Sequence, residues 1–389
     1  MKAVSIALGG ALATAVAFGP ARMGYGLFLP RFRDTFSLST TGAGLIVSAA
    51  FAAFFCALLV SAYLVARHGP RTPVVGGSLA AAIGMALIAI AQSKAMLAGG
   101  TVLAATSAGL CWSPFNDAAG RAIASGLRDR ALTVVSTGTT VGIAGAGACA
   151  LAVAALDWHW RAVWFGFSAL AVLCAVLNAY ALHRLPVKST SSFDHSTFER
   201  LAEKAVRPIY FIACSFGVTS GIYLSFAVDH VNAAGGLTGL QAGASGAVLF
   251  IAFGIGGTLG LLTADVEQRI GLRRLVQTLF PCSATSLLLV GIWPNTWVSV
   301  TGSAALQGLC LMSLSAIFSF VSQRLYPDLP TQSFTAVLAT YAFGNAIGPI
   351  LAGYVAGASS LAFAFTAAGV LSLVTSLVFR AGEATAAKG

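Results

Sequence analysis

The stretches "FGPARMGYGLF" at residues 18–28 and "FGVTSGIYLSF" at residues 216–226 carry the same pattern. Four positions coincide at an offset of 198 residues, and a pattern that recurs at a fixed offset indicates an internal repeat. The matching pairs are Phe18 with Phe216, Gly19 with Gly217, Tyr25 with Tyr223, and Phe28 with Phe226. We therefore expect the chain to consist of two related halves.

Three further pairs of short motifs recur at offsets between 199 and 206 residues. Each pair alone is a weak match, but the shared offset extends the repeat along most of the chain. The pairs are Arg67-His-Gly69-Pro-Arg71 with Arg269-Ile-Gly271-Leu-Arg273, Gly109-Leu-Cys111 with Gly308-Leu-Cys310, and Gly138-x-x-x-Gly142 with Gly344-x-x-x-Gly348.

The composition indicates an integral membrane protein. Of the 389 residues, 57% are hydrophobic and 9% are charged, and the mean hydropathy is +0.86, far from the balance of a soluble domain. A helix needs about 20 apolar residues to cross the hydrocarbon core of a bilayer. We predict twelve such helices, near residues 3–30, 42–65, 73–92, 95–118, 132–156, 162–182, 207–228, 240–264, 274–293, 296–320, 333–357 and 359–380.

The first apolar run could be mistaken for a secretory signal. The first run follows Lys2 and has the charge pattern of a secretory signal, but it is too long for one and it resembles a later segment.

The cysteines all lie inside apolar runs without a C-x-x-C pair, so we predict no disulfides and no metal site, and no cofactor. The seven are Cys56, Cys111, Cys149, Cys174, Cys214, Cys282 and Cys310.

Lysine and arginine are distributed unevenly between the two sets of loops. With a cytoplasmic N-terminus, 17 of the 22 lie on the cytoplasmic side, as the positive-inside rule requires. We therefore predict that both termini are cytoplasmic, in a bacterial inner membrane. Because topology explains the net charge of +10, we expect no nucleic-acid partner. The basic residues predicted outside are Arg31, Arg33, Lys94 and Arg161.

One long polar stretch, "HRLPVKSTSSFDHSTFERLAEKAVRP" at residues 183–208, lies between the sixth and seventh runs. It predicts an N-terminal six-helix bundle at residues 1–182, a cytoplasmic linker at 183–206 and a C-terminal six-helix bundle at 207–389. The portion "FERLAEKAVR" is compatible with an amphipathic helix on the membrane surface. Two parallel repeats of this kind are typical of a transporter whose site lies between the halves near the bilayer midplane.

The loop after the second run, "AYLVARHGPR" at residues 62–71, resembles the motif G-x-L-A-D-R-x-G-R-R of the major facilitator superfamily. Leu64 and the three gate residues Arg67, Gly69 and Arg71 are retained, whereas Ala66 replaces the usual Asp. The second copy offers Asp265 or Glu267 as acidic substitutes beside Arg269, Gly271 and Arg273. The resemblance implies an all-α membrane fold of twelve transmembrane helices in two pseudo-symmetric six-helix bundles.

Glycine-rich stretches in the fifth and eleventh runs give a second point of comparison. "GNAIGPILAG" at residues 344–353 is similar to the glycine-rich packing motif of the same family, while "GTTVGIAGAGA" at residues 138–148 lacks the proline of its antiporter form. Small residues allow helices to approach closely, so helix packing explains these stretches, and the missing proline disfavours a drug antiporter.

Arg22 is the one basic residue within the first apolar run. At 1.5 Å per residue it lies about 13 Å inward from Arg31, which is too deep for its side chain to reach the headgroups easily. An arginine at that depth normally faces a cavity or a partner and marks a functional site. Two interpretations stay open: Arg22 anchors an anionic substrate bidentately, or it is structural and bonds backbone carbonyls or a neighbouring carboxylate.

The resemblance implies that the first and seventh helices line the central cavity, which would bring Tyr25, Ser220 and Tyr223 close to Arg22. Other polar residues inside apolar runs are candidates for substrate binding, although each could equally serve helix packing. They are Trp112, Asn116, Gln307, Tyr341 and Asn345.

Proton coupling would require a titratable group within or beside the apolar runs. Asp117 and Asp229 are the candidates. Asp117 has an alternative role, because Arg121 lies four residues later on the same helix face and can pair with it.

These features predict a secondary active transporter of a small organic anion, similar to a monocarboxylate, and together they favour proton coupling. The alternative is a proton-driven efflux pump for amphipathic compounds, and a third possibility is a receptor or scaffold that retains the fold. The partners expected are a small anionic substrate, protons and the lipid bilayer, with the protein a monomer.

An enzyme is disfavoured. "GASG" at residues 243–246 is similar to the serine motif of rhomboid proteases, but all five histidines precede Ser245, and those enzymes need a later histidine to activate the serine. The chain has no G-x-x-x-x-G-K-[ST] motif for ATP.

Overall fold

The computed structural model describes residues 2–156, 158–183, 185, 200–201, 206–241, 244–326 and 330–378. Within these residues every regular element is helical, and twelve helices are long and apolar enough to span a membrane. The twelve spans are Ala3–Phe36, Thr40–His68, Arg71–Ala89, Lys94–Ala122, Arg130–Ala155, Trp160–Ala181, Arg207–Ala233, Ala244–Ile270, Leu272–Ile292, Trp297–Ser319, Gln332–Ala358 and Leu361–Val378. The predicted number of spans is confirmed; most of the predicted linker, including most of "FERLAEKAVR", lies outside the described residues.

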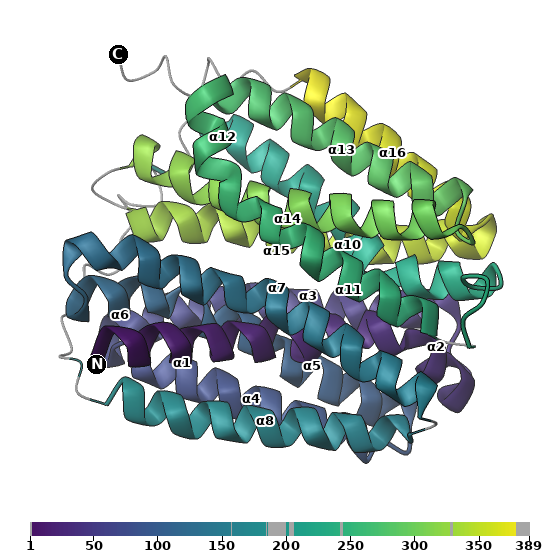
Figure 1. Ribbon diagram of the computed structural model, residues 1–389, viewed down its shortest axis with the longest axis horizontal. Coiled ribbons are helices and arrows are strands. Elements are labelled where there is room, and N and C mark those ends of the chain that lie inside the picture. Colours follow the sequence, from purple (N-terminus) through teal and green to yellow (C-terminus); the bar gives the residue numbers. More distant parts are fainter. Residues whose placement is uncertain are drawn as a thin grey trace.

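The helices form two groups that lie one above the other in Figure 1. The N-terminal group contains α1 (Lys2–Val16), α2 (Gly24–Phe36), α3 (Thr40–His68), α4 (Arg71–Ala89), α5 (Lys94–Cys111), α6 (Pro114–Ala122), α7 (Ser125–Ala155) and α8 (Trp160–Ala181). The C-terminal group contains α10 (Arg207–Ala233), α11 (Ala244–Thr258), α12 (Thr263–Ile270), α13 (Leu272–Ile292), α14 (Trp297–Leu325), α15 (Pro330–Ala358) and α16 (Leu361–Val378). Short π- and 3-10-helical segments, Ala17–Met23 and Leu259–Leu262, connect α1 to α2 and α11 to α12.

The side at which α1 begins is called the inner side below, and the side at which α2 ends is called the outer side. The distribution of Lys and Arg predicts that the inner side is cytoplasmic. The first helical span continues to Phe36 on the outer side, beyond its predicted end at residue 30. The added part contains the charged residues Arg31, Arg33 and Asp34, so it lies beyond the apolar layer, where charged side chains are solvated.

The repeated glycine motifs perform the same packing role in both halves. A Cβ at Gly138 or Gly142 on α7 would collide with the backbone of α1, and one at Gly344 or Gly348 on α15 would collide with the backbone of α10. Glycine therefore lets each pair of helices approach to backbone contact. The close packing expected from these motifs is confirmed.

The two copies of the loop motif form the same local turn. Gly69 ends α3 with φ 76°, and Gly271 ends α12 with φ 82°. Their N–H groups donate to the carbonyls of Val65 and Glu267, at 3.0 Å and 2.8 Å. Only glycine adopts such positive φ values without strain, which is why both copies keep it.

The two halves meet closely on the outer side. A Cβ at Gly26 on α2 would collide with the carbonyl oxygen of Leu224 on α10, and one at Gly44 on α3 would lie 2.7 Å from the carbonyl oxygen of Pro349 on α15. The Thr41 hydroxyl also donates to the carbonyl of Gly353 at 3.3 Å. These contacts between halves close the outer side.

Replacing Gly26 with valine should open this closure, because the added side chain cannot fit against the Leu224 carbonyl. We expect the thiol introduced by Thr41→Cys to react faster with a membrane-impermeant maleimide in the Gly26→Val background. Gly76→Val is the matched control, because nothing lies within 4 Å of a Cβ at Gly76. Equal labelling rates in the two backgrounds would contradict the assignment of Gly26 to the closure.

Candidate functional site

Arg22 lies in an irregular part of the first span. Residues Ala17–Met23 form a π-helical segment that contains Pro20, and the N–H of Gly24 donates to the carbonyl of Pro20. Proline has no N–H to donate and disturbs the regular helical ladder, and π-helical segments occur frequently at functional sites. The local sequence therefore presents Arg22 from a widened turn in the middle of the span.

The Arg22 guanidinium is enclosed by aromatic rings. Its Cζ lies 4.2 Å from the ring centroid of Phe54, 5.3 Å from those of Phe18 and Phe51, and 5.9 Å from that of Tyr341. The residue is only 6% exposed. Aromatic faces attract a cation through their quadrupole, so this cage compensates part of the cost of removing the charge from water.

Two guanidinium donors in the cage are left unpaired. Nε and Nη2 of Arg22 are buried and have no hydrogen-bond partner. These two atoms form one edge of the planar guanidinium, the edge that can hold a carboxylate through two parallel hydrogen bonds. Within the described residues, no carboxylate forms an ion pair with Arg22. The free edge of the guanidinium is therefore chemically able to hold an anion.

The cage is shared between the two halves. Phe18, Phe51 and Phe54 come from the N-terminal half, whereas Tyr341 comes from α15 of the C-terminal half. The Ser220 hydroxyl on α10 donates to the Tyr341 hydroxyl at 3.3 Å. The structure thus brings three of the predicted residues, Arg22, Ser220 and Tyr341, to one place between the halves.

A cavity of about 500 Å³ separates the halves on the inner side. Its walls come from α5 to α7 on one side and from the α11–α12 region, α14 and α15 on the other, and they include the predicted residues Trp112 and Asn116. The Trp112 ring packs against Phe18 at 5.3 Å and against Phe334 at 6.2 Å, centroid to centroid. Phe18 therefore connects the wall of the cavity to the Arg22 cage.

Four other predicted residues lie in helix packing away from Arg22's free donors. The Tyr25 hydroxyl donates to the carbonyl of Ala43 at 3.5 Å, and the Tyr223 hydroxyl bonds the Ser303 hydroxyl at 3.1 Å. Gln307 accepts from Ser283 at 3.4 Å, and the Asn345 amide donates to the carbonyl of Tyr341 at 3.0 Å. Gln307 Nε2 and Asn345 Oδ1 remain buried without a partner.

Sequence reasoning missed the aromatic residues of the cage. Phe18 belongs to the repeated stretch at residues 18–28, but no feature of the sequence distinguishes Phe51 and Phe54 from other core aromatic residues. Their spacing of three residues places them on one helix face, yet the same spacing occurs throughout apolar helices that pack in a core. Only the fold shows that this face points at Arg22.

Both candidate proton-coupling residues are engaged in ion pairs. Asp117 Oδ2 lies 2.6 Å from Arg121 Nε in an i, i+4 ion pair, which is the alternative that the spacing allowed. Asp229 on α10 pairs with Arg33 on α2, so this ion pair joins the two halves on the outer side. Arg33 also donates to the Leu38 carbonyl and to the Thr40 hydroxyl, both at 3.2 Å, which holds it on the N-terminal half.

The gate motif has few acidic contacts in this conformation. Arg67 lies over the ring of Tyr63, with 5.0 Å from Cζ to the centroid. Glu267 accepts from Arg324 through both oxygens, at 2.7 Å and 3.0 Å, within the C-terminal half. The remaining predicted residues of the motif, Arg71, Asp265, Arg269 and Arg273, are exposed. With a cavity between the halves on the inner side and close contacts between them on the outer side, the arrangement is inward-facing.

A buried site between two helical bundles, with a cavity between the bundles on the inner side, is the arrangement of alternating-access transporters. The sequence profile of the Major Facilitator Superfamily matches residues 10–265, which is more than half of the chain. The protein therefore belongs to the Major Facilitator Superfamily and is a multi-pass secondary transporter. No curated protein matches the sequence.

Solved structures with the same fold include two transporters. A bacterial homologue of the human lysosomal transporter Spinster, in an inward-facing and occupied conformation, is 18% identical, with a TM-score of 0.67 over 98% of this chain and 94% of that chain. The nucleoside transporter NupG is 13% identical, with a TM-score of 0.75 over 98% of both chains. At these identities the comparisons establish the fold.

Neutralising Asp229 should weaken the outer closure, because the Arg33–Asp229 ion pair joins α2 to α10. For Asp229→Asn we expect a loss of about 2 kcal/mol, the usual value of a charged hydrogen bond, and therefore a shift of roughly 30-fold toward outer-open states. The labelling rate of the thiol introduced by Thr41→Cys reports this shift.

Glu267→Gln is the control for the Asp229→Asn experiment, because it removes an ion pair that lies within one half. It should leave the outer labelling rate unchanged. If Glu267→Gln and Asp229→Asn have the same effect on labelling, the Arg33–Asp229 pair has no special part in the closure.

Proposed function

We propose that the protein transports a small organic anion with one carboxylate, and that Arg22 is the anchor for that carboxylate. The observation that carries this proposal is the pair of buried, unpartnered donors Nε and Nη2 of Arg22, at the interface between the halves. A cation held in a low-dielectric environment without a counter-ion attracts an anion strongly. A planar fork adds selectivity for the carboxylate geometry.

The surroundings of Arg22 support a monovalent ligand. Arg22 supplies one positive charge, and the cage residues around it include no second cation. A second anionic group would therefore be buried without compensation. The Tyr341 hydroxyl, which accepts from Ser220, can donate its own proton to a carboxylate oxygen. A bound anion would thus contact both halves at once, as alternating access about a central site requires.

Access would come through the inner cavity in the present conformation. Phe18 and Trp112 lie in contact between that cavity and Arg22, so their rearrangement would admit or release the substrate. We further propose that the protein works in a bacterial inner membrane with both termini in the cytoplasm, as a monomer of two bundles divided at residues 183–206.

An efflux pump for amphipathic compounds is the second candidate function. The cavity wall contains Trp112, Met312 and Phe334, and such aromatic and thioether side chains accommodate varied apolar ligands. In that case the ligand would occupy the cavity, and Arg22 would have a structural role. Ligand class and the response to Arg22 substitutions separate the two functions.

Replacing Arg22 with methionine should leave the ligand-free protein as stable as the parent or more stable by about 1–4 kcal/mol, because an unpaired buried charge is replaced by an apolar side chain of similar length. The same substitution should sharply reduce stabilisation by carboxylates, whereas Arg22→Lys should retain more of it. Thermal unfolding of the purified protein with carboxylates, nucleosides, sugars and cationic dyes measures both effects.

Arg161→Met is the matched control for Arg22→Met. The Arg161 guanidinium donates to the carbonyls of Ala89 and Ala91 at 3.0 Å and 2.7 Å, so its loss should destabilise the protein without changing the ligand response. If Arg22→Met destabilises the protein as Arg161→Met does, and if dyes stabilise the parent and Arg22→Met equally, Arg22 is structural and efflux is the better function.

Proton coupling is proposed through Asp117 or Asp229. Substrate accumulation in proteoliposomes should rise with an imposed pH gradient, and Asp117→Asn or Asp229→Asn should remove this dependence while binding persists. Arg121→Gln is the companion variant, because it frees Asp117 from its ion pair without removing the carboxyl group. Uptake that ignores the pH gradient in the parent protein would rule out proton coupling.

A further inference from the structure

A second polar cavity, of about 470 Å³, lies on the outer side next to the Arg33–Asp229 ion pair. One wall is the end of α2 at residues 30–34, and the other is the end of α10, the loop that follows it and the start of α11 at Ser245. The cavity therefore lies between the two halves, and it is separate from both the Arg22 cage and the inner cavity.

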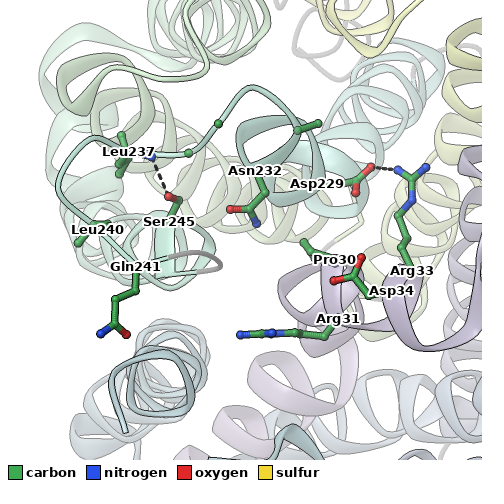
Figure 2. A pocket seen from close by; sticks show the side chains of 13 residues that line it. Pro30, Arg31, Arg33, Asp34, Asp229, Asn232, Leu237, Leu240, Gln241 and Ser245 are labelled. Carbon is green, nitrogen blue, oxygen red and sulfur yellow. Dashed lines mark hydrogen bonds and ion pairs between the residues drawn. The ribbon is translucent and has the colours of Figure 1, made fainter. Parts of the chain in front are cut away.

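The polar side chains of this outer cavity have unused donors. Arg31 from α2, Asn232 from the last turn of α10 and Gln241 from the loop all line this cavity, and in Figure 2 the Arg31 side chain extends toward the side on which Gln241 lies. Asn232 Nδ2 is buried without a hydrogen-bond partner. Within the described residues, the Arg31 guanidinium forms no ion pair, although Asp34 also lines the cavity. A cationic fork and two amides of this kind can hold an oxyanion.

The carboxylates nearby leave the cationic fork available. Asp229 lies on the wall and is neutralised by Arg33. Figure 2 shows Asp34 beside the stem of Arg31, away from Gln241. An anion in the cavity would therefore meet the Arg31 guanidinium and the amide donors, with Asp34 as the one lining carboxylate for which the described residues show no ion pair.

The loop that carries Gln241 is fixed by specific bonds. Gly235, Gly236 and Gly239 have φ values of 95°, 72° and 83°, which allow its tight turns. The N–H of Leu237 donates to the buried hydroxyl of Ser245 at 2.8 Å, and the Trp297 indole donates to the carbonyl of Thr238 at 3.1 Å. This also gives Ser245 of the "GASG" stretch a structural role.

We infer that the outer cavity is a second binding site, which takes a free carboxylate and stabilises the inward-facing state when occupied. Its lining comes from both halves, so the cavity has this form only while the outer side is closed. A ligand that binds one state more tightly shifts the population toward that state. External carboxylate at high concentration would thus slow the return to the outward-facing state and inhibit uptake. The inference rests on the proposed function only for its choice of ligand class.

The test uses benzoate, with benzamide as a neutral molecule of the same shape, on full-length protein in phosphatidylcholine nanodiscs. The Arg22→Met variant removes the proposed central anchor, so a benzoate effect that persists in it reports the outer site. In this variant we expect benzoate, and not benzamide, to slow maleimide labelling of the thiol introduced by Thr41→Cys. Adding Arg31→Gln should weaken the apparent benzoate affinity about tenfold or more, as expected for the loss of a charged hydrogen bond.

Two controls make the outcome specific. Lys94→Gln removes another outer cation, which donates to the Ser37 carbonyl at 3.1 Å, and should leave the benzoate effect intact. Nanodiscs with added phosphatidylglycerol distinguish a lipid phosphate from a free carboxylate, because an anionic headgroup in the cavity would slow labelling without benzoate and compete with it.

The inference is overturned if benzoate has no effect in Arg22→Met, if benzamide acts equally, if Arg31→Gln changes nothing, or if only phosphatidylglycerol slows labelling. These outcomes are distinguishable from failure of the proposed function. The proposed function fails if Arg22→Met responds to every carboxylate as the parent protein does. The outer site, in contrast, is measured within the Arg22→Met background.

Discussion

The electrostatic cost of the Arg22 guanidinium is the constraint on which the centre of the molecule depends. A charge this deep in a membrane protein is tolerated only where protein groups or a ligand replace the water that it loses. Three phenylalanine rings and Tyr341 supply part of that replacement, while Nε and Nη2 stay unsatisfied. The irregular helix around Pro20, the aromatic wall and the junction of the two halves are all arranged around this residue.

The pseudo-symmetry of the fold makes the asymmetry of the site informative. Glycine motifs pack α7 on α1 and α15 on α10 in the same way, so the two bundles are built alike. At the position that corresponds to Arg22, however, the second half has Ser220, which donates to Tyr341. One half thus provides the charge and the other provides hydroxyl groups, and a ligand between them would contact both.

The outer side is closed by two kinds of contact, whereas the inner side holds a cavity between the halves. Outer closure combines backbone approach at Gly26 and Gly44 with the Arg33–Asp229 ion pair. On the inner side the basic gate motif lies exposed, and Glu267 is held by Arg324 within its own half. Close packing fixes the shape of the closed side, while ion pairs can form and break as the halves move.

The sequence by itself determined the membrane-spanning class, the number of helices and the internal repeat, because hydropathy and residue spacing are local properties of the chain. It also marked Arg22 as a candidate, because a charge within an apolar run is visible in the sequence. It could not determine which side chains surround Arg22. Tyr25 shares a helix face with Arg22 but bonds Ala43 instead, and Phe51, Phe54 and Arg33 acquire their roles from residues far away in the chain. Tertiary structure decided those roles, since helix rotation and the docking of the two halves depend on packing along every helix at once.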